Sequence, residues 1–471
     1  MKTWEDLKNS GNDKMDFVRE AISEHKSSRL FGEGAIGLDY FSKRNTTITK
    51  YQKLLYTMAG EAVPDNFSAN YKFCNAFFPI FVKQENSFLL GNGVTFNEDA
   101  TKDRLGGDEF DTALMEAGEC ALWGGVSFGF FNLDHIEVFK ITEFVPLFGE
   151  EDGALHAGIR FWQIDDTKPL RATLYEEDGY TEYIWRKGEG SVLQSKKAYK
   201  QIVRESVADG TEIYDGENYP NFPIVPLWAN NLHQSEIVGL REKIDGYDLI
   251  QSGLCNTIDE ASIVYWTITN AGGMDDIDLA KFIERMKTVK AAVVDDQGSQ
   301  AEAHTLDVPY QATQMALQDL RDSLYRDAMA LDTDKISAGN VTATAIQASY
   351  ENLELKCDGY EYCVTTFIKG ILALAGIDDS PIYKRSKVMN QTETTQMILS
   401  AGDYLDDETV LNLLPFLNVD QVDEILMRKD EEEADRFEED EEEEGTEGME
   451  ESGGDDVDSF IASLESLVGG L

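Results

Sequence analysis

The chain has 471 residues, of which 42% are hydrophobic, and its 89 acidic and 41 basic side chains give a formal net charge of −48. This length and apolar content predict a folded protein with more than one substructure. A surface of this sign repels phosphate, which excludes a protein that condenses on nucleic acid through a broad basic face.

The N-terminal half of the chain is predicted to mix helices and strands. Helical periodicity covers residues 13–25 and 34–44, and 70–96 places aromatic residues at helix-like spacing before a glycine-flanked GNGVTF that resembles the start of a strand. From 121 to about 225, short alternating runs separated by turn residues predict an antiparallel sheet. Prolines in NYPNFPIVPLWANN prevent a helix and mark a boundary near residue 231.

Helices are predicted to dominate after this boundary. The first covers residues 235–269 and carries Gly239, Gly246 and Gly253 at intervals of seven. Because each glycine costs a helix about 1 kcal/mol relative to alanine, the stripe indicates a close neighbour, either in another chain or in the chain's own core. A compact insert follows, with a short helix at 275–287 and two strands, KAAVVDD and AEAHTLDVP. The next helix covers 311–331.

The stretch LDTDKISAGNVTATAI separates this predicted helix from the next one, and Lys335 is its only cation. After it, apolar residues from Ile346 to Leu374 alternate spacings of four and three, which predicts a long helix with a sustained packing seam. Three shorter helices are expected at 392–401, 407–416 and 419–427.

The C-terminal end is strongly acidic. Eighteen acids and one base lie between Asp430 and Asp458, and the run is expected to be disordered because it repels itself and lacks apolar groups. A short amphipathic stripe ends the chain. The two segments together suggest either a tether that docks on a partner or a solubilising tail.

Patterns for catalysis or metal binding are weak. The string GVSFG, Gly125 to Gly129, matches a nucleophile elbow, but Ser127 is followed by an alternating strand pattern where the elbow requires a helix. The sequence has no Walker A motif, dinucleotide fingerprint or metal-ligand spacing. We therefore expect no enzyme, metal or cofactor, and a serine esterase built on Ser127 is the weakest alternative.

The five cysteines form no C-x-x-C pair, and their odd number favours free thiols in a reducing compartment. The N-terminus lacks a signal-peptide pattern. The most apolar stretch, 121–133, is too short and glycine-rich to cross a bilayer. We expect a soluble intracellular protein without membrane contact.

Several strings, taken in order, carry a resemblance to a known family. They are YKFCNAFFPIFVKQENSFLLGNGVTF, NFPIVPLWANN with KIDGYDLIQSG, GNVTATAIQASYENLELKCD, and LDDETVLNLLPFLNVDQVDEI, spread from Tyr71 to Ile425. As a set they resemble the portal proteins of tailed bacteriophages, of the long-tailed type. The resemblance implies a ring, usually of twelve subunits, at one vertex of the phage head.

The implied fold is α+β. It has an N-terminal α/β wing at 1–231, a two-helix stem at 232–269 and 311–331, a small αββ clip at 270–310, a tunnel loop at 332–342, a long wing helix at 343–376, crown helices at 377–428, a disordered acidic linker at 429–458 and a terminal amphipathic helix at 459–471. The wing, stem and clip order agrees with the periodicity, because two helices of similar pattern flank the insert.

The resemblance also implies site residues. The DNA-facing tunnel loop would present Asp332, Thr333, Asp334, Lys335, Ser337, Asn340 and Thr342. The stem acids Glu242, Asp245 and Asp248 would line the tunnel and keep a duplex sliding, since acidic walls offer phosphate no contacts. Within the clip, terminase or adaptor docking would involve Asp276, Lys281, Glu284 and Lys287.

The implied partners are double-stranded DNA without sequence specificity, the terminase large subunit, the major capsid protein, a scaffold and a head-completion adaptor. The expected location is the virion, at the capsid portal vertex, after assembly in the host cytoplasm. Two alternatives stay open. An acidic DNA mimic or nucleoprotein-binding factor would explain the charge, and an ordinary surface turn would explain the interrupting loop.

Overall fold

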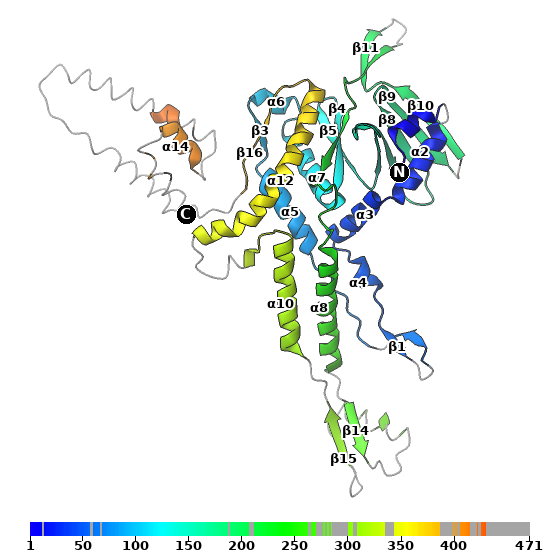
Figure 1. Cartoon of the computed structure of the whole chain (residues 1–471), viewed down its shortest axis with the longest axis vertical. Coiled ribbons are helices and arrows are strands. Elements are labelled where there is room, and N and C mark those ends of the chain that lie inside the picture. The colour runs from blue at the N-terminus through cyan, green and yellow to red at the C-terminus, as the bar shows by residue number, and fades with distance from the viewer. Residues whose placement is uncertain are drawn as a thin grey trace, which may run out of the picture. The chain divides into compact units, whose positions relative to one another are not determined.

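The computed structural model describes residues 1–11, 14–56, 60–65, 68–186, 189–206, 212–261, 265–269, 277, 280–281, 284, 300–304, 309–334, 343–386, 398, 400, 402, 406–414, 422 and 425–429. The chain divides into two compact units, Met1–Lys387 and Val388–Leu471. Unit 1 mixes helices with antiparallel strands (Figure 1), as the sequence predicts. Among the described helices, none is both long and apolar enough to cross a membrane.

The chain begins with four helices: α1 (Trp4–Asn9), α2 (Lys14–Lys26), α3 (Arg29–Phe41) and α4 (Thr46–Lys50). Local capping sets their starts. Ser28 accepts from the N–H of Phe31, and Asn45 accepts from two N–H groups of α4. The helix predicted at 13–25 is confirmed. The one predicted at 34–44 begins earlier, directly after the Ser28 cap.

A short hairpin follows, β1 (Leu54–Tyr56) paired with β2 (Ala62–Pro64), and then α5 (Phe77–Leu90) and β3 (Val94–Phe96). The strand start predicted in GNGVTF is confirmed as β3, which pairs with β16 (Pro381–Tyr383). The preceding helix begins only at Phe77. Residues 70–76 carry the same aromatic spacing but are not helical. Next come α6 (Asp99–Asp103) and α7 (Asp108–Gly124).

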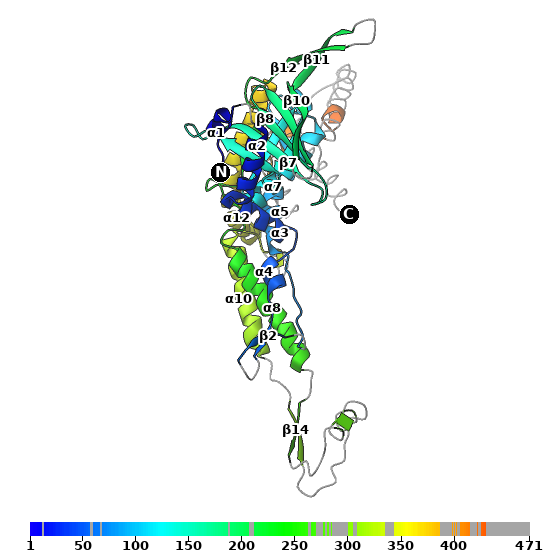
Figure 2. The same ribbon diagram turned by 90° about the vertical axis from the view of Figure 1, so that its right-hand side faces the viewer.

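The predicted antiparallel sheet structure is confirmed and divides into separate sheets. Strands β4 (Val126–Asn132), β5 (His135–Lys140) and β13 (Ile224–Trp228) form one in the order β13-β4-β5. A second has the order β10-β9-β8-β7-β6, formed by β6 (Phe144–Phe148), β7 (Leu155–Trp162), β8 (Leu170–Glu176), β9 (Gly179–Arg186) and β10 (Glu189–Lys197). The hairpin β11 (Lys200–Ser206) and β12 (Glu212–Glu217) follows. Apolar residues of α2 pack on the five-stranded sheet (Figure 2).

The helix predicted at 235–269 is wrong at both ends. It is observed as α8 (Arg241–Ala261), and Gly239 precedes it at φ 85°. Residues Tyr265–Thr269 instead form β14, which pairs antiparallel with β15 (Gln300–His304). The sequence YWTIT explains this, because β-branched and aromatic residues favour strands. The predicted strand KAAVVDD lies outside the described residues, and α10 (Tyr310–Asp327) follows.

The predicted long helix is confirmed as α12 (Ala343–Ala375), 33 residues and therefore about 50 Å long. Its seam is intrachain core: Tyr360, Val364, Phe367 and Ile371 are all at most 2% exposed. They join the main core with α5, α7 and the sheet β13-β4-β5. In unit 2, α14 (Asp407–Leu413) matches one predicted helix; the helices predicted at 392–401 and 419–427 lie largely outside the described residues.

Candidate functional site

Helices α8 and α10 lie side by side and form the candidate stem (Figures 1 and 2). The Lys243 ammonium donates to the Ser323 hydroxyl at 2.7 Å and also pairs with Asp327. At the same end, Phe77 of α5 contacts aromatic rings of both helices, with centroids 4.9 Å from Tyr247 and 6.3 Å from Tyr325. Phe77 therefore packs against both helices at this end of the candidate stem.

A polar stripe on α8 binds an extended segment of the N-terminal region. Asp248, Ser252 and Asn256 accept hydrogen bonds from the backbone N–H groups of residues 75, 73 and 71, at 3.1, 3.0 and 2.7 Å. Four helical residues rise about 6 Å, and two extended residues span about 6.6 Å. The near match lets each helical turn bind every second amide. We call residues 71–75 the arm base.

Asp248 is the centre of this stripe and is fully buried. Its carboxylate also accepts from the side-chain amides of Asn75 at 2.6 Å and Asn45 at 2.8 Å. Burial raises the pKa of Asp248, and the amide donors partly oppose that shift. A carboxylate that is buried within its own subunit cannot line a tunnel. The prediction that Asp248 is a tunnel-wall acid is therefore wrong.

The other two predicted wall acids differ from Asp248 and from each other. Asp245 is half-buried and accepts from the Tyr40 hydroxyl, while Arg241 lies 3.9 Å away. Glu242 is exposed. Of the three, Glu242 is therefore the acid whose position in the subunit best suits a solvent-facing wall.

Upstream of the arm base, the hairpin β1–β2 leaves apolar side chains uncovered, and we call this hairpin the arm tip. Leu54 and Leu55 are 50% and 43% exposed, and Val63, which pairs with Leu55 in register, is 38% exposed. Neighbouring strand residues point to opposite faces, so both faces of the hairpin expose leucine. An isolated two-stranded hairpin is marginally stable, which makes the arm tip a candidate contact surface.

Among the described residues, the glycine stripe lacks the close neighbour that the sequence predicts. A methyl group built on Gly239, Gly246 or Gly253 would have no heavy atom of the described chain within 4 Å. The intrachain-core explanation therefore fails for these positions, and the interchain explanation stays a prediction.

The candidate tunnel loop begins at a firmly anchored point. The backbone of Leu331 exchanges two hydrogen bonds with the side-chain amide of Gln84, at 2.8 and 3.1 Å. Leu331 is buried with Phe88, Tyr350, Leu353 and Cys357, and so joins α5 to α12. This small cluster therefore holds the chain just after α10 against α5 and α12.

Two of the predicted loop acids bind a stem residue. The Arg321 guanidinium of α10 lies 3.0 Å from Asp332 and also pairs with Asp334. Its hydrogen bond to Asp334 is the main cause of a raised Arg321 pKa. Thr333 lies between the two acids, and the remaining predicted loop residues, Lys335, Ser337, Asn340 and Thr342, lie outside the described part of the chain.

The predicted clip residues are only partly visible. Lys281 and Glu284 are described and exposed, whereas Asp276 and Lys287 lie outside the described residues. Strand β14 follows α8, β15 precedes α10, and the two strands pair antiparallel. The docking role of the insert stays a prediction.

A buried charge cluster connects three segments near the loop anchor. The Lys356 ammonium of α12 lies 2.7 Å from Glu85 of α5 and 2.9 Å from Glu236, which precedes α8. Burial raises the pKa of Glu85 to about 7, against the opposing effect of Lys356. Although burial opposes it, the two carboxylates hold the Lys356 pKa above its usual value.

The nucleophile-elbow alternative is contradicted by the geometry of Ser127. The residue lies within β4 and is fully buried, and its hydroxyl donates to the carbonyl of Ala117 at 2.7 Å. Among the described residues, no group of three or more His, Cys, Asp and Glu side chains could hold a metal ion.

Sequence reasoning missed the polar stripe and the arm base. Asp248, Ser252 and Asn256 recur every four residues along α8. The sequence prediction for this helix used only its apolar residues and glycines. That spacing is a usable signal for a second, polar face. It does not identify the partner, which lies more than 170 residues away in the chain.

Comparisons with known proteins agree with the family that the sequence resembles. Residues 39–447 match the family described as "Phage portal protein, SPP1 Gp6-like". The "Portal protein" of Bacillus phage SPP1 is 22% identical over 447 residues, covering 88% of this chain and 86% of that protein. The "Portal protein" of Clostridium phage phiCD119 is 24% identical over 233 residues, 47% of this chain and about half (51%) of the relative.

Two of the solved structures that match the chain come from gene transfer agent particles. The neck of a native particle, computed with C12 symmetry, has a chain with a TM-score of 0.41 at 12% identity, covering 73% of this chain and 91% of that chain. A chain of the native virion gives 0.42 at 13% identity, with the same coverage of 73% and 91%.

Proposed function

This chain belongs to the SPP1 Gp6-like family of phage portal proteins, and from that premise we propose that it forms a closed ring at one vertex of the phage head. Double-stranded DNA enters and leaves the head through this ring, and twelve is the expected number of subunits. The observation that carries the proposal is the family match over 39–447, supported by the order of α8, the paired strands β14 and β15, α10 and α12. An acidic DNA mimic explains the charge but not this order.

A ring needs two different faces on each subunit, because its contacts are heterologous. Two surfaces of the chain suit this role. The arm tip exposes apolar side chains on both of its faces, and the α8 glycines leave an open, small-residue face. We propose that both lie at contacts between neighbouring subunits.

The loop at 332–342 is proposed to face the DNA. The start of this loop is fixed, because Gln84 binds Leu331 and Arg321 pairs with Asp332. In the proposed ring, the residues after Asp334 would reach toward the duplex from this base. Lys335 would meet phosphate transiently, and exposed Glu242 would weaken adhesion of the duplex along the stem. A motor substrate then slides without sequence-specific contacts.

The remaining roles follow from the family premise and concern partners. The insert between α8 and α10 would dock the terminase large subunit during packaging and a head-completion adaptor or tail protein afterwards. The wing would contact the major capsid protein and scaffold, and the ring would help to initiate head assembly. Assembly would occur in the host cytoplasm, and the mature location would be the virion.

Electron microscopy of the purified full-length chain tests the proposal. We expect rings with a central hole, and a monodisperse 52.7 kDa monomer under all assembly conditions would contradict it. Lys335→Glu should form the same rings but package or retain less DNA. Normal packaging by this variant would return the loop to an ordinary surface turn.

A further inference from the structure

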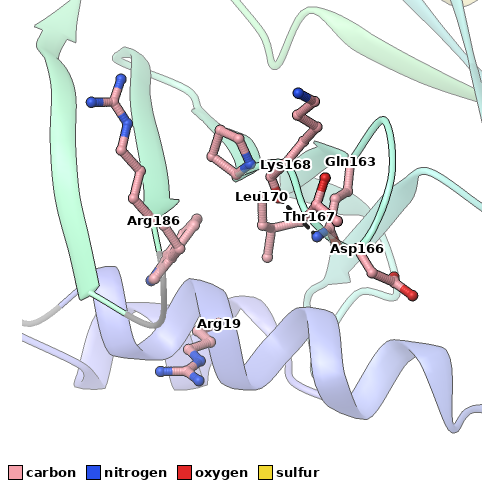
Figure 3. A pocket seen from close by; sticks show the side chains of 9 residues that line it. Arg19, Gln163, Asp166, Thr167, Lys168, Leu170 and Arg186 are labelled. Carbon is pink, nitrogen blue, oxygen red and sulfur yellow. Dashed lines mark hydrogen bonds between the residues drawn. The ribbon is translucent and has the colours of Figure 1, made fainter.

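A cavity of about 640 Å³ opens where α2, the loop 163–169 between β7 and β8, and the end of β9 meet (Figure 3). Three cationic residues line it, one from each of these elements: Arg19, Lys168 and Arg186. Asp166 is the single acid among the lining residues. The cavity therefore has a local excess of two positive charges in a chain of net charge −48.

These cations are not used by the subunit itself. Within the described part of the chain, no ion pair or side-chain hydrogen bond engages Arg19, Lys168 or Arg186, and all three are exposed. Nearby lysines behave differently, since Lys14 and Lys196 both pair with Glu176. Three unpaired cations thus line one cavity in a chain with a twofold excess of acids, and this local positive charge suits an anionic ligand.

The loop that carries Lys168 is preorganised. The Asp165 carboxylate accepts from the N–H of Thr167 at 2.7 Å and from its hydroxyl at 2.5 Å. The Gln163 amide donates to the Lys168 carbonyl at 3.0 Å, as the dashed line in Figure 3 marks. A loop already fixed in this way loses little entropy when it binds a ligand.

The cavity also has an apolar part. Trp185 is 6% exposed, and it packs in the core beneath α2, with Leu170 partly buried against the same cluster. A free phosphate or a duplex backbone has no apolar group to place there. A peptide side chain does, and flanking carboxylates would then meet the surrounding cations.

We propose that this cavity binds an acidic peptide segment of a partner protein, with one apolar side chain against Trp185 and Leu170. Arg19, Lys168 and Arg186 would contact the flanking carboxylates. The chain's overall negative charge does not prevent this, because charges beyond about 8 Å are largely screened at physiological salt. The proposal does not depend on ring assembly.

Fluorescence anisotropy with defined probes tests the site. The main probe is a labelled 12-residue Glu/Asp peptide with one central phenylalanine; a second peptide replaces that residue with serine, and a third probe is a 12-base-pair duplex. The test variant combines R19E, K168E and R186E. The matched control combines R44E, K83E and K369E, three exposed cations outside the cavity with the same total charge change.

We expect the test variant to lose at least about tenfold in affinity for the phenylalanine peptide while the control loses much less, because surface charges act mainly locally. The serine peptide should bind several-fold more weakly than the phenylalanine peptide. Equal losses in both variants, or no peptide binding at low salt, would overturn the proposal. Duplex binding that only the test variant loses, with peptide binding unchanged, would reassign the cavity to nucleic-acid phosphate. Matching melting temperatures would confirm that both variants fold.

Discussion

The base and the tip of the arm lie within 25 residues of each other and differ in how the subunit holds their backbones. At the base, residues 71–75 give their amides to buried polar side chains of α8. At the tip, Leu54, Leu55 and Val63 are exposed, and pairing with each other is the main contact of β1 and β2 among the described residues. The subunit thus secures the arm through polar contacts and leaves its apolar end available to another surface.

This difference separates two kinds of stability. Buried polar contacts should set the folding free energy of the single subunit, because their loss leaves desolvated partners unpaired. Exposed apolar contacts should matter only when subunits meet. Unfolding of the monomer and assembly of the ring measure the two contributions separately.

The largest effect is expected for Asp248→Ala at the arm base. The change would leave the buried side-chain amide of Asn45 without this acceptor and would remove two hydrogen bonds from Asn75. It should lower the free energy of unfolding by about 3 kcal/mol. Urea denaturation at a concentration where the chain is monomeric measures it. The exposed neighbour Glu242→Ala should change stability by no more than about 0.5 kcal/mol. Similar losses of unfolding free energy in the two variants would mean that the hydrogen bonds of Asp248 contribute no more to stability than the exposed Glu242 does.

The buried Glu85 extends the test to a second polar contact, away from the arm. Its pKa is about 7 in the folded chain against 4.5 for the unconstrained group. The folded state therefore keeps this proton to higher pH than the unfolded state. The stability that comes from protonated Glu85 is present below about pH 4.5 and is lost as the pH rises to about 7, on the order of 3 kcal/mol in total.

Glu85→Gln should flatten this part of the pH profile, measured by urea denaturation at several pH values. The exposed Glu351→Gln on α12 serves as the control and should keep the wild-type profile. If Glu85→Gln keeps the wild-type dependence of unfolding free energy on pH, groups other than Glu85 control that dependence.

At the arm tip, Leu55→Ser combined with Val63→Ser should leave monomer stability nearly unchanged. It should raise the concentration needed for half-assembly by roughly tenfold, which corresponds to about 1.4 kcal/mol. Mass photometry across a dilution series gives this value. Ile164→Ser, at an 83% exposed position of the loop between β7 and β8, is the matched control. Assembly at the wild-type concentration would place the tip outside the subunit contacts.

The smallest effect is expected at the open glycine face of α8. Gly246→Ala and Gly253→Ala should each stabilise the monomer by about 0.5–1 kcal/mol, since the added methyl group meets open space. If these glycines lie at subunit contacts, the same changes should impair ring formation. Gly239→Ala should instead destabilise, because its φ of 85° disfavours alanine. Stabilised Gly246→Ala and Gly253→Ala variants that still form normal rings would show that these glycines do not lie at subunit contacts.

Local pattern in the sequence predicted much of the architecture. The heptad seam of α12 is buried as expected, and the alternating runs between β4 and β13 form antiparallel sheets. The family resemblance also came from local strings. These features were readable because periods of two and 3.6 residues are intrinsic to strands and helices. The same reasoning extended α8 through YWTIT, where the spacing fitted a helix but residue type favoured a strand.

Tertiary structure alone decided which groups meet. Asp248 has the sequence signature of a solvent-facing stem acid, yet it is buried against Asn45 and Asn75 from a distant segment. Arg19, Lys168 and Arg186 are scattered single cations in the sequence and form one cavity only where a helix, a loop and a strand end converge. Periodicity specifies which face of an element is buried, but the partner that covers it is chosen by packing between segments far apart in the chain, and no local pattern records that choice.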